Sequence, residues 1–484
     1  MGQLRTRRTE AAAPTDGSVV DELASGTLGD RRLDERRNRV VTVLERHPDR
    51  GFPGACETEA ESEALYRFLR NPRVTPEAVI EPHLAATAAR CAAAREVLVI
   101  HDTTDMVFPG AAPRQGLTSL GPDRQGFWVH ASIAVSAEGQ RAPLGVVALQ
   151  SYARTQGPRR WPTNRARFTA PTKESRRWLD GVRATRTRLA ATPVIHLMDR
   201  EADSYELLAA LIEAGERFVI RATYDRTLIP TADTPACRFS EALASATVVC
   251  QRDVAVATRG NGGRTLSART RHPARVGRIA TLHVATQRMH LRRSALMTTG
   301  VPMLAVHVVW VHEIEAPPGV EPVDWRLVTT EPIGTRAQVL RIVDAYRARW
   351  LIEEYFKALK TGCAYEKRQL ESLQTLRVAL ALLAPIAWRL LHLRYLARAH
   401  PARAATAVFT PRQLRVLRAS PSGGRLTPAA TVTDVLVVVA RLGGHLQHNG
   451  PPGWLVLTRG LIKLRDMELG WIAATESQAS CDQS

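Results

Sequence analysis

Acidic residues follow two apolar runs of the kind that form buried strands. Asp102 comes directly after VLVIH (97–101), and Asp199 comes directly after PVIHLM (193–198). A single aspartate after a strand is most often a turn residue or a helix cap. Two of them, together with Glu353 on a distant predicted helix, indicate a cluster of carboxylates. Because neighbouring carboxylates repel one another, the cluster predicts bound divalent cations, and hard oxygen ligands suit Mg²⁺ or Mn²⁺.

One predicted helix face concentrates four further side chains of chemical interest. On a straight helix with about 100° per residue, they fall inside an arc of about 60°; they are Tyr346, Arg349, Glu353 and Lys360. An exposed Arg349–Glu353 pair at i,i+4 spacing contributes only about 0.3–0.5 kcal/mol, and it leaves the other two residues unexplained. A pair of metal ions beside such a face would suit in-line displacement at a phosphodiester.

Charge and composition narrow the partners. The 484 residues include 66 Lys and Arg against 47 Asp and Glu, which gives a net charge of +19. This surplus favours a polyanion, and nucleic acid before a membrane surface, because neutralised phosphates release counterions. A generally basic surface is the alternative. The hydrophobic fraction of 45% excludes wholesale disorder. The most apolar charge-free stretch, 378–388, is too short to span a bilayer.

Several common catalytic and metal-binding motifs are absent from the sequence. It contains no G-x-x-x-x-G-K-[ST] loop for a nucleoside triphosphate and no G-x-S-x-G elbow for a nucleophilic serine. The six cysteines form no C-x-x-C pair, which argues against a zinc finger. The phosphodiester of a nucleic acid is therefore the substrate that best fits the predicted carboxylate cluster.

The predicted elements indicate an α/β protein with helical ends. Residues 21–95 have a helical pattern, and the segment 28–47 is rich in arginine. Short apolar runs predict strands, at 97–101, 127–136, 143–153 and 193–198. The strand-rich region from 217 to about 321 is interpreted as an inserted sheet. Residues 336–362 are predicted as one long helix, and most of 370–484 as further helices.

The helical motif also carries a family resemblance. The spacing Tyr-x2-Arg-x3-Glu-x6-Lys, from Tyr346 to Lys360, resembles the signature of the DDE transposases of the IS-four family, in the transposon-five-like branch. The surrounding segments are similar too, namely HDTTD at Asp102, MDREADSYE at Asp199, KESRRW (173–178), LYRFLRNPRVTPEA (65–78) and RLGGHLQ (441–447). The resemblance extends from about residue 21 to about residue 465.

This resemblance implies an α/β fold with an RNase H-like (retroviral-integrase-like) catalytic core that is interrupted by a β-sheet insertion. It implies Asp102, Asp199 and Glu353 as the catalytic, metal-binding residues for two Mg²⁺ ions, with Mn²⁺ as a substitute. It also implies a set of DNA-binding residues around a base extruded near the transposon end, with an indole stacked on that base. By position, these residues are Tyr346, Arg349, Lys360, Trp325, Arg221 and Lys357.

The expected domain organisation follows from the patterns and the resemblance together. A flexible basic tail (1–20) precedes a helical DNA-end-binding domain (21–85), a catalytic core (86–390) with its insertion at about 217–322, and a helical dimerisation domain (391–484). The expected partners are the double-stranded ends of a transposon, target DNA and a second copy of the chain, and not a membrane. Because the N-terminus lacks the apolar segment of a secretory signal, we expect a cytoplasmic, nucleoid-associated protein.

The predicted activity is cut-and-paste transposition through nicking, hairpin formation, hairpin opening and strand transfer. Two alternatives remain. An RNase H-like nuclease would use the same acids without strand transfer, and a non-catalytic inhibitor of transposition would keep only DNA binding. His101 and Asp105, which flank Asp102, depart from the family pattern.

Overall fold

The structure is a computed structural model that describes residues 19–110, 112–121, 123–154, 176–231, 237–256, 258, 274–295, 297, 300–424, 426–446, 448 and 452–481. The predicted basic tail lies outside these residues, apart from Val19 and Val20, with which the first helix begins. Residues 173–175 of the KESRRW segment also lie outside them.

The N-terminal region is helical, as its pattern predicts. Its helices are α1 (Val19–Ala24), α2 (Arg31–Arg46), α3 (Phe52–Ala55), α4 (Glu59–Arg70) and α5 (Pro76–Ala92). The arginine-rich α2 begins at Asp30, whose carboxylate accepts a hydrogen bond from the backbone N–H of Arg32 at 2.9 Å. Its apolar stripe is buried against the other helices, so its exposed face is left to charged residues.

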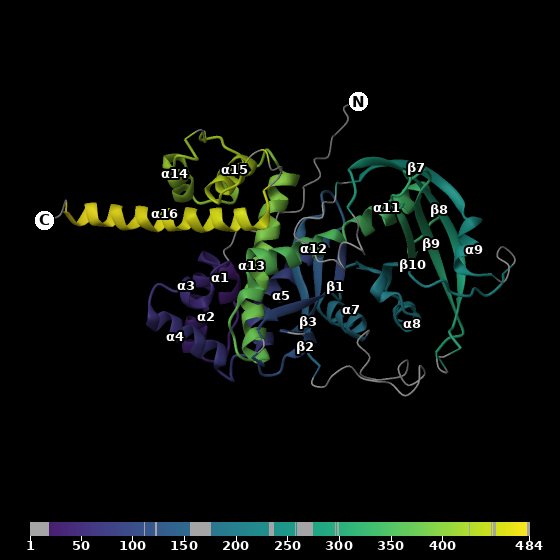
Figure 1. Ribbon diagram of the computed structural model, residues 1–484, viewed down its shortest axis with the longest axis horizontal. Helices are drawn as coiled ribbons and strands as arrows, with labels where there is room; N and C mark the ends of the chain where they lie inside the picture. Colours follow the sequence, from purple (N-terminus) through teal and green to yellow (C-terminus); the bar gives the residue numbers. More distant parts are fainter. Residues whose placement is uncertain are drawn as a thin grey trace, which may run out of the picture.

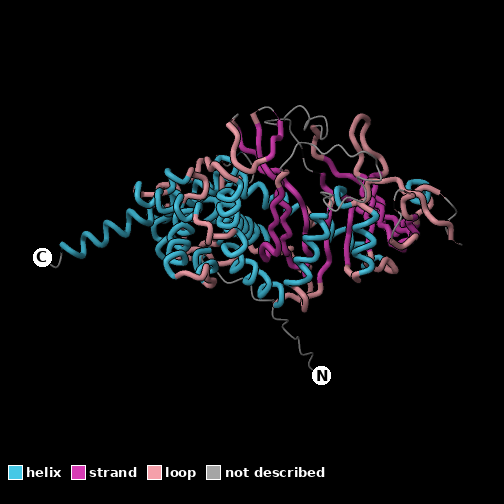
Figure 2. Tube along the Cα trace, turned by 90° about the horizontal axis from the view of Figure 1, so that it is seen from below, coloured by secondary structure: helices cyan, strands magenta, loops and turns pink. Residues whose placement is uncertain are grey.

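One ten-stranded sheet forms the middle of the molecule, and its strand order is β2-β3-β1-β5-β6-β10-β9-β8-β7, with β4 paired to β3. The strands are β1 (Val97–Pro109), β2 (Thr118–Gly121), β3 (Arg124–Ser136), β4 (Pro143–Tyr152), β5 (Val194–Met198), β6 (Arg217–Arg221), β7 (Thr247–Val256), β8 (Arg278–Arg292), β9 (Met303–Glu313) and β10 (Asp324–Thr329). In Figure 2, strands occupy the middle and one end, and helices gather at the end that carries the C-terminus.

Helices cover both faces of this sheet. α7 (Arg176–Arg188) packs against β1, β3 and β4, and α8 (Tyr205–Glu213) packs against β6 and β9. Alternate residues of β6 enter two separate hydrophobic clusters, Val219 on the side of α11 (Arg336–Arg347) and Phe218 with Ile220 on the side of α8. The chain thus has a mixed α/β architecture with a large sheet (Figure 1).

The first predicted strand is longer than its apolar run. It does not end before Asp102, because β1 continues to Pro109 and pairs with β3 in antiparallel register along its whole length. The prediction was wrong at this end because the polar residues of DTTD gave no apolar signal, while the long partner strand supplies backbone hydrogen bonds to them. Asp102 therefore lies within a strand rather than in a turn.

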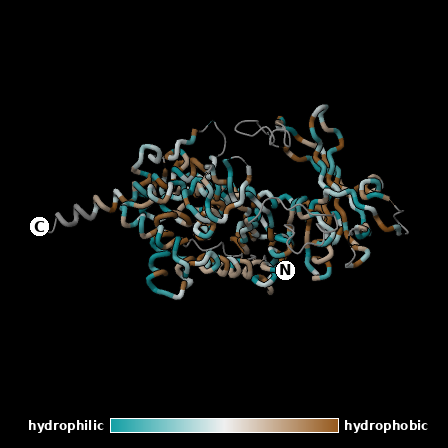
Figure 3. Tube along the Cα trace, turned by 60° about the horizontal axis from the view of Figure 1, so that its bottom comes forward, coloured by the Kyte–Doolittle hydropathy of each residue, from teal (hydrophilic) through white to brown (hydrophobic). Residues whose placement is uncertain are grey.

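The strand-rich region does not form a separate sheet that starts at 217. β6 runs parallel to β5 and antiparallel to β10, and β9, β8 and β7 continue the same sheet beyond β10. The excursion from the central strands therefore begins after β6. A short helix, α9 (Phe239–Ala244), precedes β7. Hydrophilic and hydrophobic segments are mixed along the outer strands (Figure 3), and most residues of β7 are at least partly exposed.

The long helix predicted at 336–362 is divided into three parts. α11 ends at Arg347, α12 spans Trp350–Lys357, and a π-helical turn, η2 (Ala358–Gly362), follows. The backbone N–H groups of Ala348 and Arg349 bond to carbonyls three residues back, and that of Cys363 bonds five residues back to Ala358. The turn at Ala348 and Arg349 is tighter than an α-helix, and the turn that ends at Cys363 is wider. The side-chain directions calculated for a straight helix therefore apply only approximately.

The C-terminal region is helical, with α13 (Leu373–Ala399), α14 (Pro411–Ala419), α15 (Val432–Leu442) and α16 (Trp454–Cys481). α13 is long and apolar enough to cross a membrane by length and composition, but 83% of its apolar window is buried inside the protein. It is therefore a core helix of this fold, packed against α5 and β4. The far end of α16 projects beyond the other helices (Figure 1).

Candidate active site

Two of the predicted acids follow the paired residues of two neighbouring strands in the middle of the sheet. β1 and β5 are parallel, and their last paired residues are Ile100 and Leu197. Asp102 and Asp199 each follow two residues later, so both lie just beyond the end of this ladder. Asp199 also caps a short helical turn, η1 (Arg200–Ala202), and its Oδ1 accepts a hydrogen bond from the N–H of Glu201 at 2.8 Å.

The third predicted acid comes from α12 and is joined to the first by an arginine. Arg349 places one guanidinium nitrogen 3.3 Å from Oδ2 of Asp102 and the other 2.6 Å from Oε1 of Glu353. The helical spacing of Arg349 and Glu353 gives the second contact, whereas the first spans 247 residues of sequence. The packing of α12 against β1 makes this contact possible.

Burial is the main influence on the electrostatics of Asp102. Burial, and next the neighbouring charge of Asp199, raise the pKa of Asp102 to about 7, although Arg349 and the N–H of Thr103 act in the opposite direction. The charge of Glu353 raises this pKa further. Asp199 and Glu353 therefore both act on Asp102, and the guanidinium of Arg349 offsets only part of this effect.

An aromatic and cationic cluster lies beside the acids. The ring of Tyr346, which is buried, meets the indole of Trp325 edge to face, with centroids 5.5 Å apart. Burial raises the pKa of Tyr346 to about 12, and the nearby charges of Arg349 and Arg221 lower it. The guanidinium of Arg221 donates to the backbone carbonyl of Asp324 at 2.9 Å. The structure thus brings four of the six predicted DNA-binding residues together.

Comparison with known proteins identifies the family. Residues 17–74 match the family described as transposase DNA-binding, and residues 94–388, more than half of the chain, match the transposase DDE domain family. The chain belongs to the DDE transposase family.

The transposase is also similar to one solved assembly, described as the piggyBac transposase synaptic complex with hairpin DNA. The identity is 10%, the TM-score is 0.35, and the match covers 81% of this chain and 70% of the other. At this TM-score the likeness carries no argument about fold or function.

The two predicted lysines lie in different surroundings. Lys360 of the transposase donates to the backbone carbonyl of Asp105 at 2.5 Å, and its ammonium lies 3.4 Å from Oε1 of Glu366. Lys357 instead pairs with Glu354 at 2.9 Å. Glu354 also accepts from Arg394 at 2.7 Å, so the structure directs Lys357 toward the C-terminal helices rather than toward the Arg349 cluster.

The family generally uses divalent metal ions, and the donor set here fits such an ion. Asp102, Asp199 and Glu353 offer only carboxylate oxygens, which are the hard ligands that such ions prefer. Among the described residues, no three His, Cys, Asp or Glu side chains stand close enough to hold a metal as they are arranged. The contacts of Arg349 account for this arrangement, since its guanidinium occupies the position between two of the acids.

Sequence reasoning did not identify one residue that contacts the predicted site, Glu366. The carboxylate of Glu366, in the short turn η3 (Tyr365–Lys367), accepts from the N–H of Val107 at 2.9 Å and contacts Lys360 at 3.4 Å. It therefore ties the end of the helical motif to β1, close to Asp105. The only available signal was its position six residues after Lys360, which does not distinguish it from an exposed acid.

Proposed function

We propose that this transposase performs cut-and-paste transposition of an insertion sequence, as a member of the transposon-five-like branch of the IS-four family. The observation that carries the proposal is the double ion pair of Arg349 with Asp102 and Glu353. It unites a strand aspartate with the four-residue helical motif, and Asp199 acts electrostatically on the same strand residue. The aligned cations and aromatic rings support a site for DNA rather than for a small phosphate ester.

Asp102, Asp199 and Glu353 are the residues that would hold two Mg²⁺ ions, with Mn²⁺ as a substitute. Such ions supply Lewis-acid stabilisation of the attacking and leaving oxygens of a phosphodiester. The chain itself holds Asp102 and Asp199 beside the end of the β1–β5 ladder and joins Glu353 to Asp102 through Arg349. Nicking, hairpin formation, hairpin opening and strand transfer are all displacements at a phosphodiester, so one site serves them in turn without a covalent protein intermediate.

Arg349 and Lys360 are proposed to change partners when DNA binds. In the free protein their charges are satisfied by carboxylates, Asp102 and Glu353 for Arg349, and Asp105 and Glu366 for Lys360. A DNA phosphate offers each of them an alternative charge-assisted acceptor. Release of Arg349 would leave its acids to divalent cations, so binding of DNA and of metal would favour each other.

The aromatic pair is proposed to hold an extruded base. Trp325 is half-buried and packs against Tyr346 with its ring edge at a centroid distance of 5.5 Å. Stacking of an unpaired base on such a ring contributes about 1–3 kcal/mol. Arg221 would add positive charge beside this base. Lys357 would bind a phosphate farther along the strand, in exchange for Glu354.

The proposed assembly follows the domain expectations. Residues 21–85 would bind the transposon ends, and residues 391–484 would form the contact between two copies in a synaptic homodimer. The projecting part of α16 is available for such a contact (Figure 1). The proposed location is the nucleoid region of the cytoplasm.

Incubation with a labelled end tests this proposal. The substrate is a duplex taken from the DNA that flanks the gene, incubated with Mg²⁺ and resolved on a denaturing gel. We expect a nick followed by a hairpin. Asp102→Ala and Glu353→Ala should abolish both products, and Glu213→Gln, an exposed acid on α8, should leave them unchanged.

Each alternative gives a different outcome. Nicked product without a hairpin, at any time or metal concentration, would assign the protein to nucleases that lack strand transfer. Binding of the end without cleavage would assign it to the non-catalytic inhibitors. Full activity of the Asp102→Ala and Glu353→Ala variants would contradict the proposed site.

A further inference from the structure

A buried row of polar side chains crosses three strands directly behind Asp102. Ser132 of β3, His101 of β1 and His196 of β5 are each at most 1% exposed. Oγ of Ser132 lies 2.8 Å from Nδ1 of His101, and Nε2 of His101 lies 2.9 Å from Nδ1 of His196. A continuous chain of hydrogen bonds thus links the three strands through their side chains.

The carboxylate of Glu216 orients His196 at one end of this row. Nε2 of His196 lies 3.5 Å from Oε2 of Glu216, which can only accept, so this nitrogen of His196 carries the proton. The bonds of His196 to His101 and of His101 to Ser132 then run in one consistent direction along the row. Every nitrogen in the row has a partner.

The row lies at the end of the backbone hydrogen bonds between β1 and β5. The ladder between β1 and β5 ends at the pair Ile100–Leu197, and the acids follow two residues later. Since side chains alternate along a strand, His101 points to the face opposite Asp102. Its bond to His196 is therefore a link between β1 and β5 at the point where their acids begin.

α7 closes over this row from the opposite side to α12. A Cβ atom at Gly181 of α7 would lie 2.9 Å from Nε2 of His130 and 3.1 Å from Nδ1 of His101, so only glycine allows this close approach. Trp178 of the same helix packs edge to face on His130 at 4.9 Å, and Nδ1 of His130 lies 2.8 Å from Oγ1 of Thr103. The packing leaves the histidines little freedom to move.

We propose that His196, bonded to His101 and oriented by Glu216, is a positioning residue that fixes the spacing of Asp102 and Asp199. The inference rests on the proposed function, because the spacing matters only if the two acids share divalent cations. A hydrogen bond placed behind metal-binding residues typically changes metal affinity by about 10-fold or more when it is lost.

The test is a titration of Mn²⁺ alone into the full-length protein bound to double-stranded DNA, with the free ion followed by electron paramagnetic resonance. His196→Leu should weaken Mn²⁺ binding about 10-fold. His196→Asn, which offers an amide oxygen near the position of Nδ1, should recover most of the affinity. His392→Leu removes another buried histidine, on α13, and should leave Mn²⁺ binding unchanged.

A second pair of variants keeps the test decisive if His196→Leu does not fold. Glu216→Ala removes the acceptor at the partly exposed end of the row and should also weaken Mn²⁺ binding, whereas Glu213→Ala, on the exposed end of α8, should not. Wild-type affinity in the folded His196→Leu or Glu216→Ala protein would overturn the inference, as would an equal loss in His392→Leu. Undiminished binding in Asp102→Ala would overturn the proposed function itself.

Discussion

At neutral pH, the carboxyl group of Asp102 is about half protonated, because burial and the charge of Asp199 raise its pKa to about 7. In the unfolded chain the same group ionises near pH 3.8. Between these values the folded state holds a proton that the unfolded state has lost. The contribution of Asp102 to stability is therefore present at low pH and is lost as the pH rises toward 7.

Replacement of Asp102 by asparagine should remove this dependence. Without divalent cations, Asp102→Asn should have a free energy of unfolding that exceeds the wild-type value more at pH 8 than at pH 5, by about 2 kcal/mol. Urea denaturation of both proteins at the two pH values measures this difference. Parallel pH profiles would show that Asp102 is not held in the environment described.

The three acids were singled out from local signals, an apolar run before Asp102 and Asp199 and a helical motif around Glu353, and the contacts of Arg349 link two of them. The neighbours of Lys360 were not predictable. Its contacts with Asp105 and Glu366 depend on the π-helical turn η2 and on the approach of η3 to β1, which are tertiary effects. The roles of all these residues in catalysis and DNA binding stay predictions.

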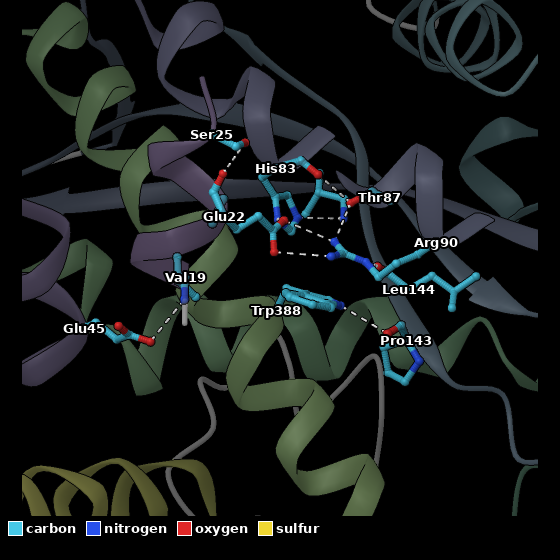
Figure 4. Close-up of polar contacts among 12 residues, drawn as sticks. Val19, Glu22, Ser25, Glu45, His83, Thr87, Arg90, Pro143, Leu144 and Trp388 are labelled. Carbon is cyan, nitrogen blue, oxygen red and sulfur yellow. Dashed lines mark hydrogen bonds and ion pairs between the residues drawn. The ribbon is translucent and has the colours of Figure 1, made fainter. Parts of the chain in front are cut away.

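At the scale of elements, α1 is held to the core by one buried polar network (Figure 4). Glu22 of α1 accepts from Nδ1 of His83 at 2.6 Å and from Arg90 at 3.2 Å, both on α5. Nε2 of His83 accepts from the N–H of Val146 at 3.1 Å, so the imidazole is neutral. Arg90 also stacks over the indole of Trp388 on α13, at 4.3 Å.

Loss of this carboxylate should destabilise the protein. Glu22→Ala leaves two buried donors unpaired, and we expect the free energy of unfolding to fall by about 2–4 kcal/mol. The matched control is Glu35→Ala on α2, whose pair with Arg31 is exposed and should contribute less than about 1 kcal/mol. Equal effects of the two substitutions, measured in urea, would contradict the structural role given to Glu22.

Most elements were predictable from periodicity, but their pairing was not. The runs at 143–153 and 193–198 gave strands β4 and β5 at nearly the predicted bounds. The pairing of β6 with β10 brings together residues about a hundred positions apart, such as Arg221 and Leu327. No local sequence pattern predicts this pairing. The inserted strands were for this reason interpreted as a separate sheet, whereas they extend the central one.

For the whole molecule, the net charge of +19 should govern DNA binding. A groove between α2 and α4 has three arginines in its lining, Arg36, Arg39 and Arg67, together with Glu57, Glu61 and apolar residues. Binding of a duplex end should weaken steeply with salt, because each neutralised phosphate releases counterions. Arg39→Ala should lower the slope of log affinity against log salt by about 1, and Arg183→Ala on α7 should leave it unchanged. A flat salt dependence of the wild type would contradict a phosphate-binding role for α2.

Asp102, Asp199 and Glu353 are proposed to share divalent cations beside the helical motif. A structure of the protein with duplex end DNA and Mn²⁺, with the ions located by anomalous scattering, would test this directly. We expect anomalous peaks in contact with all three carboxylates, and Arg349 turned from Asp102 to a DNA phosphate. Peaks bound elsewhere, or an Arg349 that still joins Asp102 to Glu353 with DNA in place, would contradict it.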